Sequence, residues 1–283
     1  MTKTKKNAFW GSVAAMPHAV WCVLFIIAPL CFILYYAFTD ASGSFTTANI
    51  TDLLDPLYLK VLKNSVVIAL EATAVCLVLA YPLAYFISRA KASTQSVMAV
   101  LIMLPMWVNF LIRTYSLKIL FENNGILNSI IKLLGSEPIY FFDEKNAKIT
   151  ILIGMVYNFL PYMVLPIYSV MTKIDSRLLE AAGDLGCNGV KTLTKVILPL
   201  SVSGIISGIT MVFVPSISTF FISQSLSDGR IKLIGDVIEQ HFNLASTTSY
   251  NIGSALSMVM MVLILISMFI MNKLGDDDGG VVV

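Results

Sequence analysis

Charged residues are scarce in this chain. Of its 283 residues, 13% are Asp, Glu, Lys or Arg and 57% are hydrophobic, and the mean hydropathy is +0.82. A soluble domain carries about 25% charged residues, so this composition excludes an ordinary soluble protein and favours one that lies in a membrane. The net charge of +2 gives no reason to expect a nucleic-acid partner.

The sequence also lacks the usual patterns of catalysis and metal binding. Its two histidines, His18 and His241, are far apart, and its four cysteines include neither a CxxC pair nor a zinc-binding spacing. No phosphate-binding GxxxxGK(S/T) loop, HExxH or GxSxG motif occurs. We therefore expect no enzymatic site, no metal and no cofactor in this chain. If the protein pumps a solute, its energy comes from a partner or from an ion gradient.

Six apolar segments are long enough to cross a bilayer, which requires roughly 20 residues. The first follows three lysines, as a signal peptide would, but its apolar run is too long for one, so we interpret it as a retained helix. The third and fifth have the least distinct ends. The sequence thus predicts an all-α membrane protein with six transmembrane helices, near residues 13–38, 64–88, 97–118, 149–171, 199–221 and 251–272.

We expect these helices to form one membrane domain over residues 13–272. Residues 1–12 would be a cytoplasmic N-terminus and residues 273–283 a cytoplasmic tail, whose last part, GDDDGGVVV at 275–283, we expect to be disordered. The short segment around Arg89 and the one from Lys173 to Lys195 are basic, and basic residues favour the cytoplasmic side. An even number of helices then places both termini in the cytoplasm.

A polar stretch with glycines lies between the fourth and fifth apolar segments, where residues 180–199 read EAAGDLGCNGVKTLTKVILP. Two alanines favour a short helix with little side-chain bulk, so that another protein can approach its backbone closely. Gly186 can end this helix in the left-handed conformation. Pro199 suits the first turn of the next membrane helix. The residues that define the pattern are Glu180, Ala181, Ala182, Gly186, Leu198 and Pro199.

This pattern resembles the EAA loop of ABC-importer permeases, here about residues 175–199; an ordinary loop between two helices is the alternative. The resemblance implies a type I ABC-importer permease fold. It also implies that the loop forms a short helix which docks into a cleft of a cytoplasmic ATPase. Residues 56–89, 104–121 and 178–208 are similar to the PotB-type permeases of spermidine/putrescine importers, most specifically around Trp107.

The resemblance implies partners and a location as well. The chain would pair with a second, PotC-like permease in a bacterial inner membrane and take substrate from an extracellular PotD-like polyamine-binding protein. Two copies of a PotA-like ATPase would bind ATP and magnesium and drive alternating access. The alternatives are a permease for another solute, such as thiamine, iron or an oxyanion, and an ATP-independent channel or secondary carrier.

A polyamine needs carboxylates, aromatic faces and carbonyls along its path. Pro105 interrupts the third helix beside Trp107, and carbonyls freed there must face protein or a wet cavity. For each aromatic residue, Tyr162 and Phe221 included, the alternative is that it packs against a neighbouring helix or lies in the interfacial belt of the membrane. The candidates for the path are Trp107, Asn109, Tyr115, Tyr157, Glu71 and Phe220.

Glu71 is the acid that lies well inside a predicted span. Because intramembrane acids face the bundle interior or water, it could contact a substrate cation at the outer mouth of the path. Alternatively it pairs with Arg113 or is a hydrogen-bonded neutral acid. We expect Arg113 itself to lie at the outer headgroups or to pair with an acid.

Overall fold

A computed structural model describes residues 16–244 and 246–278, with side chains up to Lys273. These residues form helices and connecting segments, and the β pairing among them is a single bridge between Thr39 and Phe45. Within these described ranges, four helices are long and apolar enough to cross a membrane, and two bent helix pairs bring the number of possible spans to six. The predicted fold class is confirmed, and the segments predicted with the least distinct ends, the third and fifth, are the two bent pairs.

The unbroken candidate spans are Met16–Ala37, Pro56–Ser88, Ala147–Met171 and Thr247–Lys273. The first contains the π-helical turn η1 (Val23–Ile27) and α2 (Ala28–Ala37); the next two are α4 and α8. The fourth belongs to α15 (Thr247–Asp278), which extends beyond the predicted span. The tail that we expected to be disordered is therefore helical as far as Asp278, and its remaining residues lie outside the described ranges, as do residues 1–15.

The other helices are shorter. In the third span α5 (Ala92–Trp107) meets α6 (Phe110–Phe121) and then α7 (Ile126–Leu133) at an angle of 88°. In the fifth, the run Gly189–Leu200 meets α12 (Val202–Ser218) at 69°. That run consists of α10 (Gly189–Thr192), the π-helical turn η3 (Leu193–Ile197) and α11 (Leu198–Leu200). The remaining elements are α3 (Ala48–Thr51), η2 (Asp52–Leu54), α9 (Ser176–Asp184), α13 (Phe221–Ser227) and α14 (Ile234–Asn243).

The chain divides into two compact units. Unit 1 comprises residues 1–59 and 238–262. Within it Asn49 joins the end of α2 to α3, because its amide nitrogen donates to the carbonyls of Ala37 (3.1 Å) and Thr39 (2.8 Å). The hydroxyl of Tyr58 lies 3.3 Å from Nε2 of His241, and burial lowers the pKa of this histidine. Unit 2, residues 60–237 and 263–283, contains both bends and the loop with the EAA pattern.

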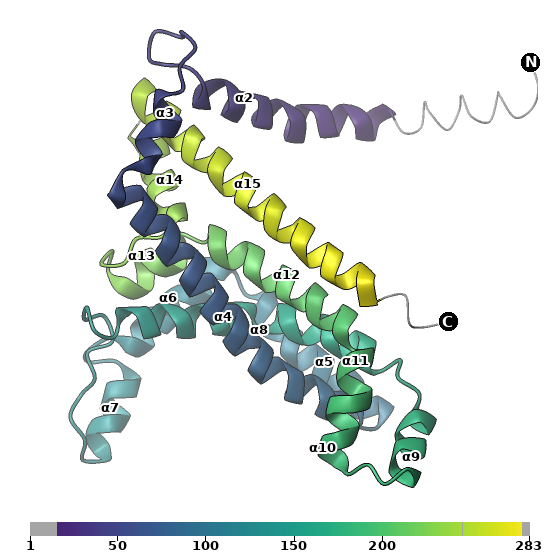
Figure 1. The fold of residues 1–283 in the computed structure, drawn as a ribbon. Coiled ribbons are helices and arrows are strands. Elements are labelled where there is room, and N and C mark those ends of the chain that lie inside the picture. The colour runs from purple at the N-terminus through teal and green to yellow at the C-terminus, as the bar shows by residue number, and fades with distance from the viewer. Residues whose placement is uncertain (1–15, 245, 279–283) are drawn as a thin grey trace, which may run out of the picture. The chain divides into compact units, whose positions relative to one another are not determined.

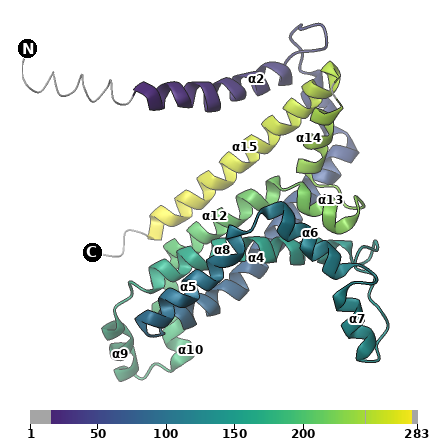
Figure 2. The ribbon, with the colours of Figure 1, turned by 180° about the vertical axis from the view of Figure 1, so that it is seen from behind.

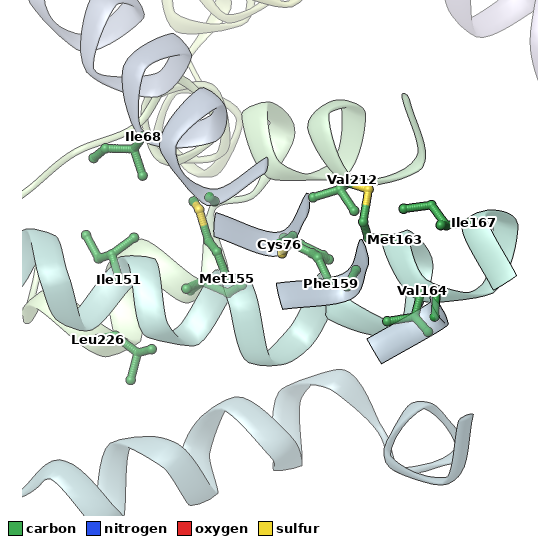
Figure 3. Packing of buried hydrophobic residues seen from close by; sticks show 14 of the residues in the cluster. Ile68, Cys76, Ile151, Met155, Phe159, Met163, Val164, Ile167, Val212 and Leu226 are labelled. Atoms are coloured by element: carbon green, nitrogen blue, oxygen red, sulfur yellow. The ribbon is translucent and has the colours of Figure 1, made fainter. Parts of the chain in front are cut away.

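Helix α8 is the central element of unit 2 and packs against α5, α6, α12 and α13. Its fully buried side chains recur every four residues, as in Ile151, Met155 and Met163, which places them on one face of the helix. The facing residues of α4 are mostly small at the same spacing. Figure 3 shows the packing of Ile68 and Cys76 from α4 against α8, together with Val212 from α12 and Leu226 from α13; Ala72, Ala80 and Ala84 belong to the same cluster.

Two glycines let α12 approach α8 closely. A Cβ at Gly208 would lie 2.7 Å from Sδ of Met163, and one at Gly204 would lie 3.0 Å from the carbonyl oxygen of Pro166. Small residues four apart are the usual means by which membrane helices pack, since lipid supplies no hydrophobic drive between them. Figures 1 and 2 place α9 and α10 at one end of unit 2 and α6, α7 and α13 at the other.

Candidate functional site

The predicted short helix of the EAA loop is α9. Its N-cap is Asp175, whose carboxylate accepts a hydrogen bond from the backbone N–H of Arg177 at 2.9 Å. At the other end Gly186 has a φ of +79°, and its N–H donates to the carbonyl of Gly183 (2.9 Å). The N–H of Cys187 donates to the carbonyl of Ala182 (3.0 Å). This pair of bonds is the Schellman cap that a left-handed glycine permits, so the predicted role of Gly186 in ending the helix is confirmed.

The two faces of α9 differ. Leu179 and the buried Ala182 face unit 2, whereas Leu178, Ala181 and Leu185 are exposed. Leu185 is 85% exposed. The prediction that both alanines let a partner approach the backbone closely is wrong for Ala182, because its side chain is covered by this chain's own residues, whereas Ala181 is exposed. The exposed apolar residues at spacings of three and four form a ridge on one side of the helix, with Glu180 exposed as well.

Pro199 lies in a different place from the one we predicted. It is in α11, which continues the helical run from Gly189, and α12 begins only at Val202. In the preceding π-helical turn the N–H of Leu198 donates to the carbonyl of Leu193, five residues back. A proline has no N–H and its ring crowds the carbonyl four residues earlier, so the wider turn accommodates Pro199. Leu198 and Pro199 are both exposed.

The third predicted span is interrupted between Trp107 and Phe110, as Pro105 and Asn109 suggested. Val108 is extended, and Asn109 becomes the N-cap of α6, where its side-chain oxygen accepts from the N–H groups of Leu111 (2.8 Å) and Ile112 (3.4 Å). The side chain of Asn109 is therefore already engaged with its own backbone. Trp107 is the last residue of α5 and is 75% exposed.

Arg113 holds this bend, and the prediction that it pairs with an acid is wrong, since no ion pair of Arg113 occurs among the described residues. Its side chain is buried, with 7% exposed, and its Nη1 donates to the carbonyl of Pro105 at 2.9 Å. Its expected place at the outer headgroups stays a prediction. Its guanidinium carbon lies 5.8 Å from the centre of the Tyr157 ring on α8. A cation satisfies carbonyls at the C-terminal end of a helix, which is the position of Pro105 in α5. The guanidinium thus ties α5, α6 and α8 together.

Glu71 does not pair with Arg113 either. Its Oε1 lies 2.7 Å from Nζ of Lys148, the second residue of α8, and both side chains are partly exposed. This ion pair places Glu71 level with the first turn of α8, so Glu71 lies near one end of the shared span and not deep within it. No spacing along the chain could select Lys148, since the pairing arises from the packing of α4 beside α8.

The aromatic candidates fall into two groups. Tyr115 meets Phe221 edge to face, with ring centres 5.2 Å apart, and Phe220 is 41% exposed beside them at the N-cap of α13. Tyr157 lies under Arg113, and Tyr162 packs against Phe159 with ring centres 6.3 Å apart. The structure therefore brings Tyr115, Tyr157 and Phe220 to the α6–α8–α13 end of unit 2. Whether any of them touches a substrate stays a prediction.

One charged contact at this end was missed from the sequence. Nζ of Lys118 on α6 lies 2.8 Å from Oδ1 of Asp228, which follows α13. The same ammonium lies 5.8 Å from the centre of the Phe142 ring. The three residues are far apart in the sequence and follow no motif, so only the packing of α6 against α13 reveals them.

Unit 2 therefore carries a glycine-capped helix with an exposed apolar ridge at one end and aromatic and charged groups at the other. Residues 13–276 match the family described as binding-protein-dependent transport system inner membrane component. The chain belongs to this family. It is a multi-pass inner-membrane component of such a transport system, with the permease fold of ABC importers.

Individual relatives agree with this family. The chain is 36% identical to the spermidine/putrescine transport system permease protein PotB of Haemophilus influenzae. This similarity extends over 258 residues and covers 88% of each of the two chains. It is 40% identical over 230 residues to PotB of Escherichia coli K12, covering 78% of this chain and 82% of that protein. A solved bacterial alginate ABC transporter, in complex with its alginate-bound periplasmic protein, contains a chain of the same fold, with a TM-score of 0.82, 15% identity and 99% coverage of both chains.

Proposed function

We propose that this chain is the permease subunit of an ATP-driven importer of polyamines and forms part of their translocation path. The observation that carries the proposal is the 36–40% identity, over most of the chain, to permeases named for spermidine and putrescine. The carboxylates and exposed aromatic rings at the α6–α8–α13 end of unit 2 are the chemistry that an alkylammonium requires.

We further propose that α9 couples this chain to its energy source. A PotA-like ATPase dimer would seat the ridge of Leu178, Ala181 and Leu185 in a cleft, and would bind the ATP and magnesium. A PotC-like permease would complete the path, and a PotD-like binding protein would deliver the polyamine to the opposite end of unit 2. The exposed apolar ridge supports this arrangement, because a ridge of that kind on a membrane protein's water-facing loop favours a protein partner.

The orientation of the chain follows from the same proposal and has a separate test. If α9 faces the cytoplasm, as do both termini, Cys187 beside the Schellman cap should react with a membrane-impermeant thiol reagent only in inside-out vesicles. The thiol of Cys187 is partly exposed, and removal of the ATPase should increase its reactivity. If Cys187 is labelled from outside in intact cells, α9 faces outward and the proposed orientation is wrong.

The transport function is tested by uptake in proteoliposomes that contain the complete complex. Labelled spermidine and putrescine should enter only with internal ATP and the binding protein, and thiamine should not compete. Uptake without ATP would favour a secondary carrier or channel. Competition by thiamine would indicate that the complex transports thiamine rather than polyamines.

The coupling role is tested at the end of α9. Gly186→Asp should abolish most of the binding-protein-stimulated ATP hydrolysis, because the left-handed backbone costs a side chain about 1 kcal/mol or more and the new charge lies beside the apolar ridge. Glu180→Lys should act in the same direction, since it reverses a charge on the exposed face. A Cβ at Gly186 would meet nothing within 4 Å, so the membrane domain itself should remain folded.

Gly189→Asp is the matched control. It adds the same side chain in the same loop, into open space and without a positive φ. Its coupling should stay close to that of the wild type. If both Gly186→Asp and Glu180→Lys retain wild-type coupling, α9 does not transmit energy from the ATPase to the permease.

A further inference from the structure

The contact between Lys118 and Asp228 has the composition of a binding site for an alkylammonium group. Nζ of Lys118 is held by a carboxylate oxygen at 2.8 Å and faces the Phe142 ring at 5.8 Å. A carboxylate together with an aromatic face is the usual way in which proteins bind an ammonium group. The groups come from α6, from the segment before α8 and from the end of α13, so the tertiary fold assembles them.

Local structure does not explain why residue 228 is an acid. Among the described residues, Asp228 is the one non-glycine residue with a positive φ, at 47°. Gly or Asn would adopt this conformation at least as readily. A carboxylate at the C-terminal end of α13 is also unfavourable with respect to the helix dipole. What the carboxylate adds at this position is a negative charge 2.8 Å from the Lys118 ammonium, which also faces the Phe142 ring.

We propose that Asp228 and Phe142 form a subsite for one ammonium group of an incoming polyamine, and that Lys118 occupies this subsite until the substrate displaces it. This rests on the polyamine transport proposed above. Both the lysine and the substrate present a protonated amine on an alkyl chain, so the carboxylate is never left without a partner during the exchange. The side chains of Lys118 and Asp228 are 30% and 48% exposed, so water can solvate the lysine as it leaves.

The Glu71–Lys148 pair provides an internal contrast. It has the same charges at a similar distance, 2.7 Å. Among the described residues, however, no aromatic ring faces the ammonium of Lys148 as Phe142 faces that of Lys118. The complete arrangement of ammonium, carboxylate and ring therefore occurs at Asp228 and not at Glu71.

If Lys118 is an occupant that the substrate displaces, neutralising Lys118 and neutralising Asp228 should change the KM for spermidine in opposite directions. A structural ion pair would give changes in the same direction. In proteoliposomes containing the complete complex, Lys118→Gln should lower the apparent KM for spermidine by about two- to fivefold, because exposed ion pairs of this kind are weak and the competing ammonium is gone. Asp228→Asn should raise the KM by a similar factor, and the double variant should match Asp228→Asn. Phe142→Leu should raise the KM by about twofold.

Charge-matched controls are available at the same end of unit 2. Lys132→Gln on α7 and Glu122→Gln after α6 make the same changes in charge at exposed residues. Both should leave the KM within about a factor of 1.5, since neither charge takes part in the subsite. If Lys118→Gln and Asp228→Asn shift the KM in the same direction, or neither shifts it beyond the controls, the contact is structural and the proposal is wrong.

A second measurement separates this proposal from polyamine transport itself. Putrescine should raise the thermal unfolding midpoint of the purified complex, 1,4-butanediol should not, and Asp228→Asn should abolish the effect of putrescine. If the wild-type complex imports no polyamine, the proposed function fails, but this measurement still tests the subsite. An equal putrescine effect in the wild type and Asp228→Asn, or no effect in either, would overturn it.

Discussion

The two bends of unit 2 are held in different ways. The first bend, between α5 and α6, is fixed by polar side chains: Asn109 caps α6, and Arg113 binds the carbonyl of Pro105. The second bend, between Leu200 and α12, is fixed by close packing, because the backbone of Gly204 lies against Pro166 and Ile167 of α8. Two hydroxyl contacts support it, because Ser201 Oγ lies 3.2 Å from the Tyr81 hydroxyl and donates to the carbonyl of Leu198 at 3.0 Å.

This difference shows two solutions to the same problem, which is how to bend a helix in a membrane without leaving backbone groups unsatisfied. The first bend depends on charge and hydrogen bonding, so it should be sensitive to the loss of polar groups. The second depends on the absence of a side chain, so it should be sensitive to added volume. Both rest on α8, through Tyr157 at the first bend and through residues 166–167 at the second.

The largest effect is expected at Arg113. Arg113→Ala should lower the free energy of unfolding of the purified complex by about 3 kcal/mol, because a charged hydrogen bond and a buried side chain are lost together. Arg113→Lys should lose less, since it keeps the charge. Arg230→Ala, at an exposed arginine, is the control. An equal loss in Arg113→Ala and Arg230→Ala would show that the guanidinium does not hold the first bend.

The second-largest loss of stability is expected on substitution of Gly204. A Cβ there would lie 3.0 Å from the carbonyl oxygen of Pro166 and 3.1 Å from Cα of Ile167. Gly204→Ala should therefore destabilise the complex by about 2 kcal/mol through overpacking, measured by denaturant titration in detergent. Gly183→Ala on α9, where nothing lies within 4 Å, should be neutral or slightly stabilising. Equal behaviour of the two variants would contradict close packing at the second bend.

A smaller effect is expected at the cap of α6. Asn109→Ala should cost about 1 kcal/mol, the usual value for the loss of an N-cap side chain. Asn109→Asp keeps the acceptor and should restore most of the stability. Thermal unfolding of the three proteins checks the order. If Asn109→Asp is as unstable as Asn109→Ala, the side chain acts through something other than the cap.

The smallest effect is expected at the contact between the Tyr81 and Ser201 hydroxyls of the second bend. Tyr81→Phe and Ser201→Ala should each cost about 0.6 kcal/mol, which is typical of hydrogen bonds between membrane helices. A double-mutant cycle should give a coupling of the same size. A coupling as large as the loss expected for Arg113→Ala would show that the second bend also depends mainly on polar contacts.

The sequence predicted the parts of this fold that depend on local patterns. Apolar length located the spans, and Gly186 marked the end of α9 because a left-handed glycine is a local requirement. Pro105 and Asn109 indicated a break, but nothing local indicated its angle of 88°. The burial of Ala182 was not predictable, because the sequence alone does not say which face of a short helix the chain itself covers.

Charged contacts in the candidate site were the least predictable. Glu71 was assigned a possible partner on the third span and has one on α8 instead, and the contact of Lys118 with Asp228 follows no spacing. Both pairs depend on which helices lie side by side at one end of unit 2. Two groups on different helices can be matched only when the packing is known, since their separation along the chain says nothing about their distance in space.

The partners of Arg113 also constrain how the protein is made. The Pro105 carbonyl precedes the arginine on the growing chain, but the Tyr157 ring that faces its guanidinium is synthesised only with α8. Inserting an arginine into an apolar span is costly, up to about 2.5–3.5 kcal/mol at the centre of the span on the translocon scale and less toward its ends. The α5–α6 segment therefore reaches the bilayer before its charge is fully covered. Its biogenesis is complete only when a later helix arrives, so truncation before α8 should leave this segment poorly integrated.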